Sequence, residues 1–166
     1  MSTHRSTARL CGLISILLGQ KSTCDQECIG RSRGGLSTKI HATCDALGNP
    51  TSFHLTPGQA HDLDGADALL PELLKKAQAL LADKADGAKE RVLEPLEQAQ
   101  VQAVIPQKSN EKQSRAFDSD RYRWRHLIEN FFAELKQYRA IATRYDKRAC
   151  TFPGGVHLAA IAIWLK

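Results

Sequence analysis

The sequence predicts one α/β domain whose mixed sheet is flanked by helices. Three observations predict it. The chain has 166 residues, enough for one domain with a buried core, and its composition of 42% hydrophobic and 25% charged residues is that of an ordinary globular protein. Apolar residues alternate in some segments and follow a helical period in others. The resulting elements follow one another as hairpin, helix, strand, helix, strand and long helix.

The first predicted elements form a β-hairpin. Leu36–Asp45 alternates between two sets of residues in the way typical of a half-buried strand. Gly48-Asn49-Pro50 marks a turn, and Phe53 and Leu55 continue the alternation in a second strand. We expect His41 to be exposed, because it lies on the polar face of this hairpin.

The remaining elements follow from helical periodicity and from breaker residues. A helix is predicted over Ala66–Lys76, with Asp62 or Asp64 as its N-cap and Pro71 as an interruption or a restart. Ala77–Ala82 fits either a helix or a short buried strand. The later elements are a helix over Ala88–Gln98, a strand over Val101–Ile105, a polar basic loop over Gln107–Ala116, a long helix over Asp118–Tyr138, and a closing helix over Val156–Lys166 entered through Pro153-Gly154-Gly155.

The long helix carries a polar motif, Tyr122-x2-Arg125-x3-Glu129-x6-Lys136. At about 100° per residue, the four side chains fall within an arc of about 60°, away from the apolar side that begins with Trp124. One face of this helix therefore packs into a core while another presents a carboxylate flanked by cations. Helix statistics alone favour a solvated face with i,i+3 and i,i+4 ion pairs.

The net charge of +5 is concentrated in one segment. Lys108–Arg148 contains eleven Lys and Arg residues against six Asp and Glu residues, which accounts for the whole excess. Aromatic residues are interleaved with these cations, a composition that suits a polyanion such as DNA. The alternative is a charged helix that keeps the protein soluble.

Cysteine usage and hydropathy indicate the compartment. The five cysteines are an odd number, and we find no secretory signal, so we expect a reducing cytoplasm. Leu10–Leu18 is apolar but has only about half the length needed to span a bilayer. We therefore expect no membrane partner.

Five stretches occur in the order typical of one family: Gly30–His41, Leu55–Asp62, Leu81–Ala85, the Tyr122-to-Lys136 motif, and Arg139–Lys147. Together they resemble bacterial insertion-sequence transposases with a DDE catalytic domain, in particular the insertion-sequence-five type within the insertion-sequence-four superfamily. The resemblance covers Asp25–Lys166. It implies a ribonuclease-H-like fold, in which Ala77–Ala82 is a strand.

The resemblance also implies the site. Asp83 and Glu129 match the family's catalytic, metal-binding carboxylates, whereas without the resemblance Asp83 is better explained as a turn residue. Tyr122, Arg125 and Lys136 match positions that contact DNA. The implied cofactor is Mg²⁺ in a two-metal site, with Mn²⁺ as a substitute, because carboxylates suit hard cations and metal pairs serve phosphodiester chemistry. The implied partners are double-stranded DNA at the element ends and the target, and further copies of the chain in a homo-oligomer formed during transposition, in a bacterial, nucleoid-associated setting.

One part of the family pattern has no counterpart. The family's first Asp lies on a strand before the Gly30 loop, but the acidic residues upstream of Gly30 are only Asp25 and Glu27, neither on a convincing strand. We therefore expect an N-terminally incomplete, frameshifted or decaying copy whose N-terminal strand is missing or degenerate. Residues 1–29 are then a degenerate segment, and residues 30–166 are a partial DDE transposase domain.

The predicted function is that of a DNA transposase, which cleaves and transfers the strands of an insertion sequence with the help of metal ions. We expect this copy to be inactive for lack of the first Asp, with Asp45 as the nearest other candidate for a third ligand. One alternative is a non-catalytic DNA-binding transposase fragment that inhibits the intact enzyme. Another is a chain that does not fold stably, which circular dichroism would reveal.

Overall fold

The computed structural model describes residues 10–20, 27–33, 35–83, 89–107 and 118–166. Parts of the predicted N-terminal segment and nearly all of the predicted polar basic loop lie outside these ranges.

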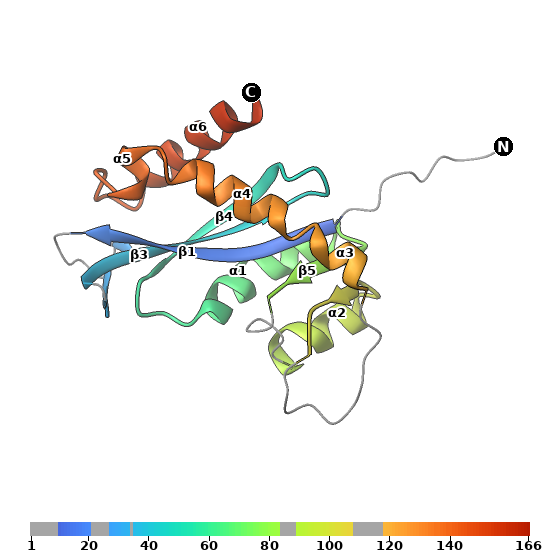
Figure 1. Ribbon diagram of the computed structural model, residues 1–166. Coiled ribbons are helices and arrows are strands. Elements are labelled where there is room, and N and C mark those ends of the chain that lie inside the picture. The colour runs from blue at the N-terminus through green and yellow to red at the C-terminus, as the bar shows by residue number, and fades with distance from the viewer. Residues whose placement is uncertain (1–9, 21–26, 34, 84–88, 108–117) are drawn as a thin grey trace.

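A six-stranded mixed sheet forms the centre of the fold (Figure 1). Its strands are β1 (Leu10–Gln20), β2 (Gly30–Ser32), β3 (Gly35–Cys44), β4 (Pro50–Pro57), β5 (Ala79–Ala82) and β6 (Gln102–Val104). β2 and β4 pair antiparallel with β3, and β3 pairs antiparallel with β1. On the other side of β1, β5 and then β6 continue the sheet in parallel. This arrangement confirms the predicted class, a ribonuclease-H-like mixed sheet.

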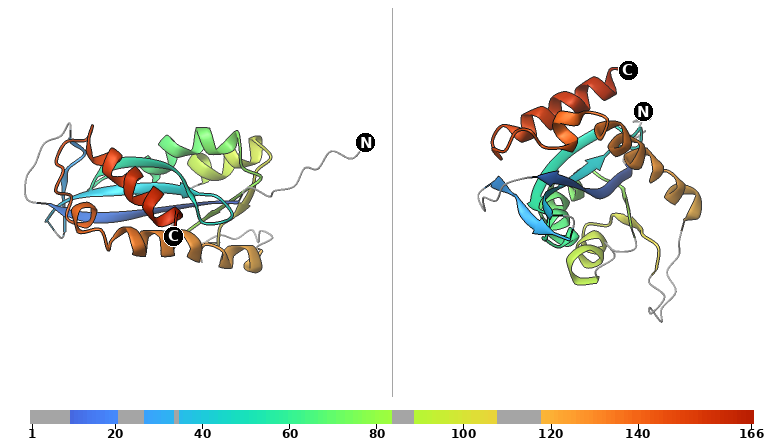
Figure 2. Two further views of the ribbon diagram at one scale, coloured as in Figure 1. Left: turned by 90° about the horizontal axis from the view of Figure 1, so that it is seen from above. Right: turned by 60° about the vertical axis from the view of Figure 1, so that its left-hand side comes forward.

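Helices cover both faces of the sheet (Figures 1 and 2). They are α1 (Asp62–Leu74), the π-helix η3 (Lys89–Leu93), α2 (Glu94–Gln98), α3 (Ser119–Arg123), α4 (His126–Leu135), α5 (Arg139–Ala142) and α6 (Phe152–Trp164). One apolar core joins β3 to α4 and α6 and includes Ile40, Phe132 and Val156. A second core, on the opposite face, joins β5 to α1 and α2 and includes Leu80 and Leu96.

The N-terminal strand departs from expectation in one respect. We expected it to be missing or degenerate, but β1 is present and pairs with β3 from Gly12 to Gln20 and with β5 from Leu10 to Leu13. A run of apolar residues suits a strand that has neighbours on both sides within a covered sheet. The sequence of β1 contains no Asp or Glu. Backbone structure at this position therefore persists without an acidic residue.

The hairpin forms as predicted, but its burial differs. β3 is buried on both faces, not on one, because α1 covers the face that we took to be solvated. His41 is 1% exposed and its Nε2 lies 2.7 Å from Oγ1 of Thr56. Its ring packs against Gly65 of α1, where a Cβ atom would come within 2.1 Å of the ring. The expectation that His41 is exposed was wrong.

Three helix boundaries also differ from the sequence prediction. α1 is capped by the side chain of His61 in a capping box with Asp64, and it continues through Pro71 without interruption. α6 begins at Phe152, so Pro153 lies inside its first turn, where a proline is tolerated. The predicted long helix is broken at Trp124 and Arg125 into α3 and α4.

Candidate carboxylate site

The position of Asp83 follows from the alternation of β5. Ala79 and Leu81 pack with Val104 on the sheet face that carries Tyr122, whereas Leu80 packs in the core on the opposite face. Asp83 follows the strand two residues after Leu81. The alternation of a strand therefore continues onto the same face, at the carboxyl end of β5.

Arg125 brings the two predicted carboxylates together. Its Nη2 lies 2.6 Å from Oε1 of Glu129, one helical turn later, and its Nη1 lies 3.6 Å from Oδ2 of Asp83. The side chain of Arg125 is 21% exposed, against 51% for Asp83 and 47% for Glu129. A mostly covered guanidinium therefore lies between two half-exposed carboxylates, Asp83 and Glu129, and contacts both.

Tyr122 forms one wall of this cluster. The guanidinium carbon of Arg125 lies 5.5 Å from the centre of the Tyr122 ring, within the range of a cation–π contact. The ring also packs against the apolar group of Ala79, Leu81 and Val104. Burial raises the pKa of the Tyr122 hydroxyl, opposed by the positive charge of Arg125 and assisted by the two carboxylates. The phenol therefore stays protonated and able to donate a hydrogen bond at neutral pH.

The break between α3 and α4 lies at Trp124 and Arg125. The backbone N–H of Trp124 donates to Arg121, that of Arg125 to Tyr122, and that of Leu127 to Trp124, all with i→i+3 spacing. This tightening turns Trp124 outward, 48% exposed, although the ideal helical projection placed it on the apolar side. A short i→i+3 stretch within a helix is a common site of adjustment.

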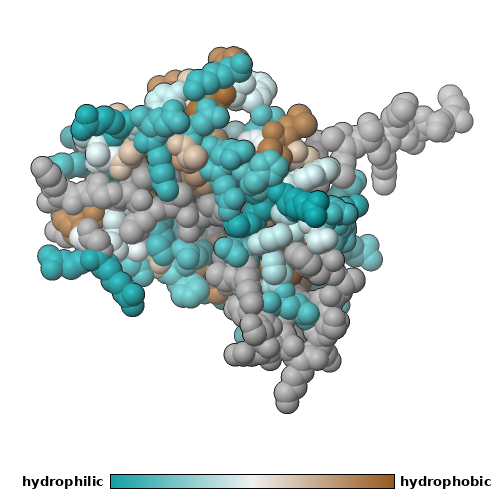
Figure 3. All heavy atoms as spheres, in the orientation of Figure 1, coloured by the Kyte–Doolittle hydropathy of each residue, from teal (hydrophilic) through white to brown (hydrophobic). Residues whose placement is uncertain are grey.

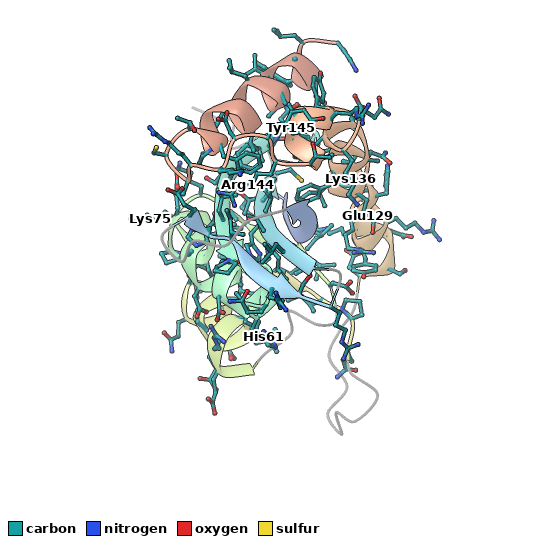
Figure 4. All side chains as sticks on the ribbon, turned by 90° about the vertical axis from the view of Figure 1, so that its left-hand side faces the viewer. His61, Lys75, Glu129, Lys136, Arg144 and Tyr145 are labelled. Carbon is teal, nitrogen blue, oxygen red and sulfur yellow. The ribbon has the colours of Figure 1, made fainter. Side chains whose placement is uncertain are left out.

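Lys136 lies apart from the Arg125 cluster. It follows α4 as its C-cap residue, about two turns beyond Glu129, and is exposed. Figure 4 shows Glu129 on α4 and Lys136 at the C-terminal end of that helix, across the sheet from His61. Figure 3 shows mainly hydrophilic residues over α3 and α4. Lys136 therefore extends the polar face without contacting either carboxylate through any described ion pair.

The register identifies where a third carboxylate would have to lie. Leu13 of β1 pairs with Ala82, so position 14 is level with Asp83. Position 14 also pairs with Ala42, which belongs to the core under α4. By backbone register this position therefore shares a sheet face with Asp83, and it is occupied by isoleucine.

Of the other acidic candidates, Asp25 lies outside the described residues, and neither Asp45 nor Glu27 supplies the third carboxylate. Oδ1 of Asp45 accepts hydrogen bonds from the backbone of Leu47 and Asn49, so the carboxylate closes the hairpin turn. Glu27 accepts a hydrogen bond from the backbone N–H of Ala149, at the loop before α6. Within the ranges that the structure covers, no group of three or more His, Cys, Asp or Glu side chains could hold a metal ion.

Comparison with known proteins now identifies the family. The sequence profile described as the transposase DDE domain matches residues 19–162. The chain belongs to this family. It is also 38% identical over 133 residues to a Brucella ovis protein named as a transposase for insertion sequence element IS6501, and the match covers 79% of this chain and all of that protein.

Membership of the transposase DDE-domain family gives the site a chemical context. The family acts on DNA and depends on divalent metal ions, as the resemblance implied. Among the helices described, none is long and apolar enough to cross a membrane.

The family resemblance named the candidate residues of the site but not the contacts between them. It assigned Arg125 to DNA, whereas the structure shows it bound to both carboxylates. The i,i+4 spacing of Arg125 and Glu129 was the available signal for one of these contacts. The contact with Asp83 depends on how β5 packs beside α3 and α4, which no local pattern reveals.

Proposed function

We propose that this chain is the catalytic portion of an insertion-sequence transposase, of the insertion-sequence-five type, that binds DNA but is impaired in strand cleavage. The observation that carries the proposal is the joining of Asp83 and Glu129 through Arg125 at the end of β5. Family membership is the reason for proposing this reaction. The absence of an Asp or Glu in the sequence of β1 is the reason for proposing that cleavage is impaired.

Asp83 and Glu129 are suitable metal ligands. Both present carboxylate oxygens that are half exposed, and Mg²⁺ prefers oxygen ligands while keeping several of its own waters. Metal ions bound there would activate the attacking oxygen and stabilise the leaving oxygen. Mn²⁺ has the same preference for oxygen and serves as a substitute. Two carboxylates hold one ion loosely and position a second poorly, which accounts for the proposed loss of activity.

Tyr122, Arg125 and Lys136 are the proposed DNA contacts. The exposed ammonium of Lys136 suits a phosphate as a point charge, and Arg125 offers a planar fork for phosphate oxygens. The Tyr122 ring lies beside Arg125, whose guanidinium contacts both carboxylates, close to where a scissile phosphate would have to lie. The described part of the basic segment, residues 118–148, contains eight Lys and Arg residues against five Asp and Glu residues, an excess that favours binding to DNA.

A second candidate function is a non-catalytic DNA-binding fragment that inhibits the intact transposase. The observation that favours it is the isoleucine at position 14, because a folded domain without the third carboxylate retains its DNA surface. Inhibition would follow from competition for element ends or from mixed oligomers with intact copies.

The test uses the purified chain and labelled DNA that carries the inverted repeats flanking its coding sequence. We expect retention of this DNA in a gel at low salt, with no nicking when Mg²⁺ is added. Nicking that is lost in Glu129→Gln would show that the chain is an active enzyme after all. Absence of retention at low salt would contradict both proposed functions.

A further inference from the structure

Arg125 occupies the space between two carboxylates that a metal site would also use. Its two terminal nitrogens contact different acids, Glu129 at 2.6 Å and Asp83 at 3.6 Å. Removing either contact alone leaves the other carboxylate beside the guanidinium. The arrangement satisfies the charge of both acids with one organic cation.

We propose that Arg125 is a resident substitute for the metal ion, which must leave Asp83 and Glu129 before a divalent cation binds between them. The inference rests on the proposed metal site and adds how a metal ion would enter it. It separates two roles of one side chain: Arg125 keeps the carboxylates together in the metal-free protein and is released toward DNA phosphates when the metal arrives.

Electrostatics makes the two cations competitors. A guanidinium and a divalent ion that share the same two carboxylates would repel one another at close range, where the partly covered position of Arg125 reduces screening by water. The free energy of breaking two ion pairs therefore reduces the affinity of the carboxylates for the metal ion. Removing the guanidinium removes this cost.

The local backbone gives Arg125 a route of movement. It lies at the break between α3 and α4, as the N-cap residue of α4. The contact with the Tyr122 ring, at 5.5 Å, provides an apolar and aromatic surface along which the guanidinium can shift. A change in the environment of Tyr122 is then a direct reporter of release.

The experiment compares Mn²⁺ binding by three full-length proteins: the unmodified chain, Arg125→Gln and Arg91→Gln. Free Mn²⁺ is measured by electron paramagnetic resonance in the absence of DNA. Arg91 is the matched control because it also pairs with two carboxylates, Asp64 and Asp67, but on α1, across the sheet. Both substitutions change the net charge equally, so only a local effect separates them.

We expect Arg125→Gln to lower the dissociation constant for Mn²⁺ by about tenfold or more, and Arg91→Gln to leave it unchanged. Equal or weaker binding by Arg125→Gln would overturn the inference. A further variant, Glu129→Gln, separates the two levels of the argument. If Glu129→Gln loses Mn²⁺ binding while Arg125→Gln shows no gain in Mn²⁺ affinity, the metal site is supported, but the proposal that Arg125 takes the place of the metal ion is wrong. If Glu129→Gln binds Mn²⁺ as the unmodified chain does, the proposed site itself fails.

A second measurement uses the unmodified chain and does not depend on the folding of any variant. The Nε–H signal of Arg125 is followed by nuclear magnetic resonance during a titration with Mg²⁺. Release predicts that this signal shifts with the same midpoint as metal binding, while the signal of Arg91 stays in place. A stationary Arg125 signal at saturating Mg²⁺ would contradict the proposal.

Discussion

Arg125 and Glu129 form an ion pair of 2.6 Å across one helical turn, and the same guanidinium reaches Asp83, the residue that follows strand β5. One guanidinium therefore pairs with both carboxylates of the site. The pair is local in sequence, but the third member is supplied by the end of β5. The fold of the sheet, not the helix alone, assembles the cluster.

Neutralising either carboxylate should alter metal binding without unfolding the domain. Asp83→Asn and Glu129→Gln each remove one half-exposed partner of Arg125, and exposed ion pairs contribute about 1 kcal/mol or less to stability. We expect the free energy of unfolding of both variants, measured in urea, to lie within about 1 kcal/mol of that of the unmodified chain. Mn²⁺ affinity should fall in both. Asp67→Asn, which removes a carboxylate on α1, is the control that should keep the affinity.

Lys136 should contribute to DNA binding through one phosphate contact. Lys136→Ala is expected to weaken retention of duplex DNA and to reduce the slope of log affinity against log salt by about 1. Lys75→Ala is a close control, because Lys75 is also an exposed C-cap lysine but ends α1 on the other face (Figure 4). Equal salt slopes for the two variants would remove Lys136 from the DNA interface.

Most of the order of elements from β3 onward could be predicted from the sequence, and the family resemblance proposed the residues of the candidate site. Alternation gave β3 and β4, and the polar motif identified Arg125 and Glu129 on a helix beside a core. The burial of His41 could not be predicted, because it depends on α1 crossing over a strand face that looks polar. β1 could not be assigned either, since its apolar run has no alternation and becomes a strand only between β3 and β5.

Arg144 should be important for stability, although the family-like stretch that contains it, Arg139–Lys147, was assigned no role. It is 2% exposed, with a left-handed φ of 44°, and its guanidinium donates to the carbonyls of Glu27, Cys28, Asp146 and Lys147. Burial lowers its pKa, but the group stays charged at neutral pH. Arg144→Ala would leave these part-buried carbonyls without their donor and should cost about 3 kcal/mol.

Urea denaturation provides the measurement for Arg144, with the exposed neighbour Arg148→Ala as the control. The control should change the free energy of unfolding by about 0.5 kcal/mol or less. A similar small change in Arg144→Ala would show that water replaces the guanidinium without cost.

His41 should make stability depend on pH. Burial lowers the pKa of His41 from 6.5 to about 4, so the folded protein holds the neutral ring while the unfolded chain takes up a proton at higher pH. Because the unfolded state binds more protons between these values, stability falls as the pH decreases from about 6.5 to about 4. The full loss from this residue is about 3 kcal/mol.

The free energy of unfolding measured in urea at several pH values would test this dependence. His41→Gln should reduce the slope of the free energy of unfolding against pH between about pH 4 and 6.5. His126→Gln, at an exposed histidine, should leave this slope unchanged. An unchanged slope in His41→Gln would assign the pH dependence to other groups.

The central claim is that Asp83 and Glu129 are two ligands of a site whose third position, at residue 14 of β1, carries isoleucine. The most direct measurement is Mg²⁺-dependent nicking of labelled element-end DNA by Ile14→Asp, beside the unmodified chain and the double variant Ile14→Asp with Asp83→Asn. We predict nicking by the single variant only. Robust cleavage by the unmodified chain would contradict the claim, as would an Ile14→Asp protein that folds and binds DNA but gains no cleavage.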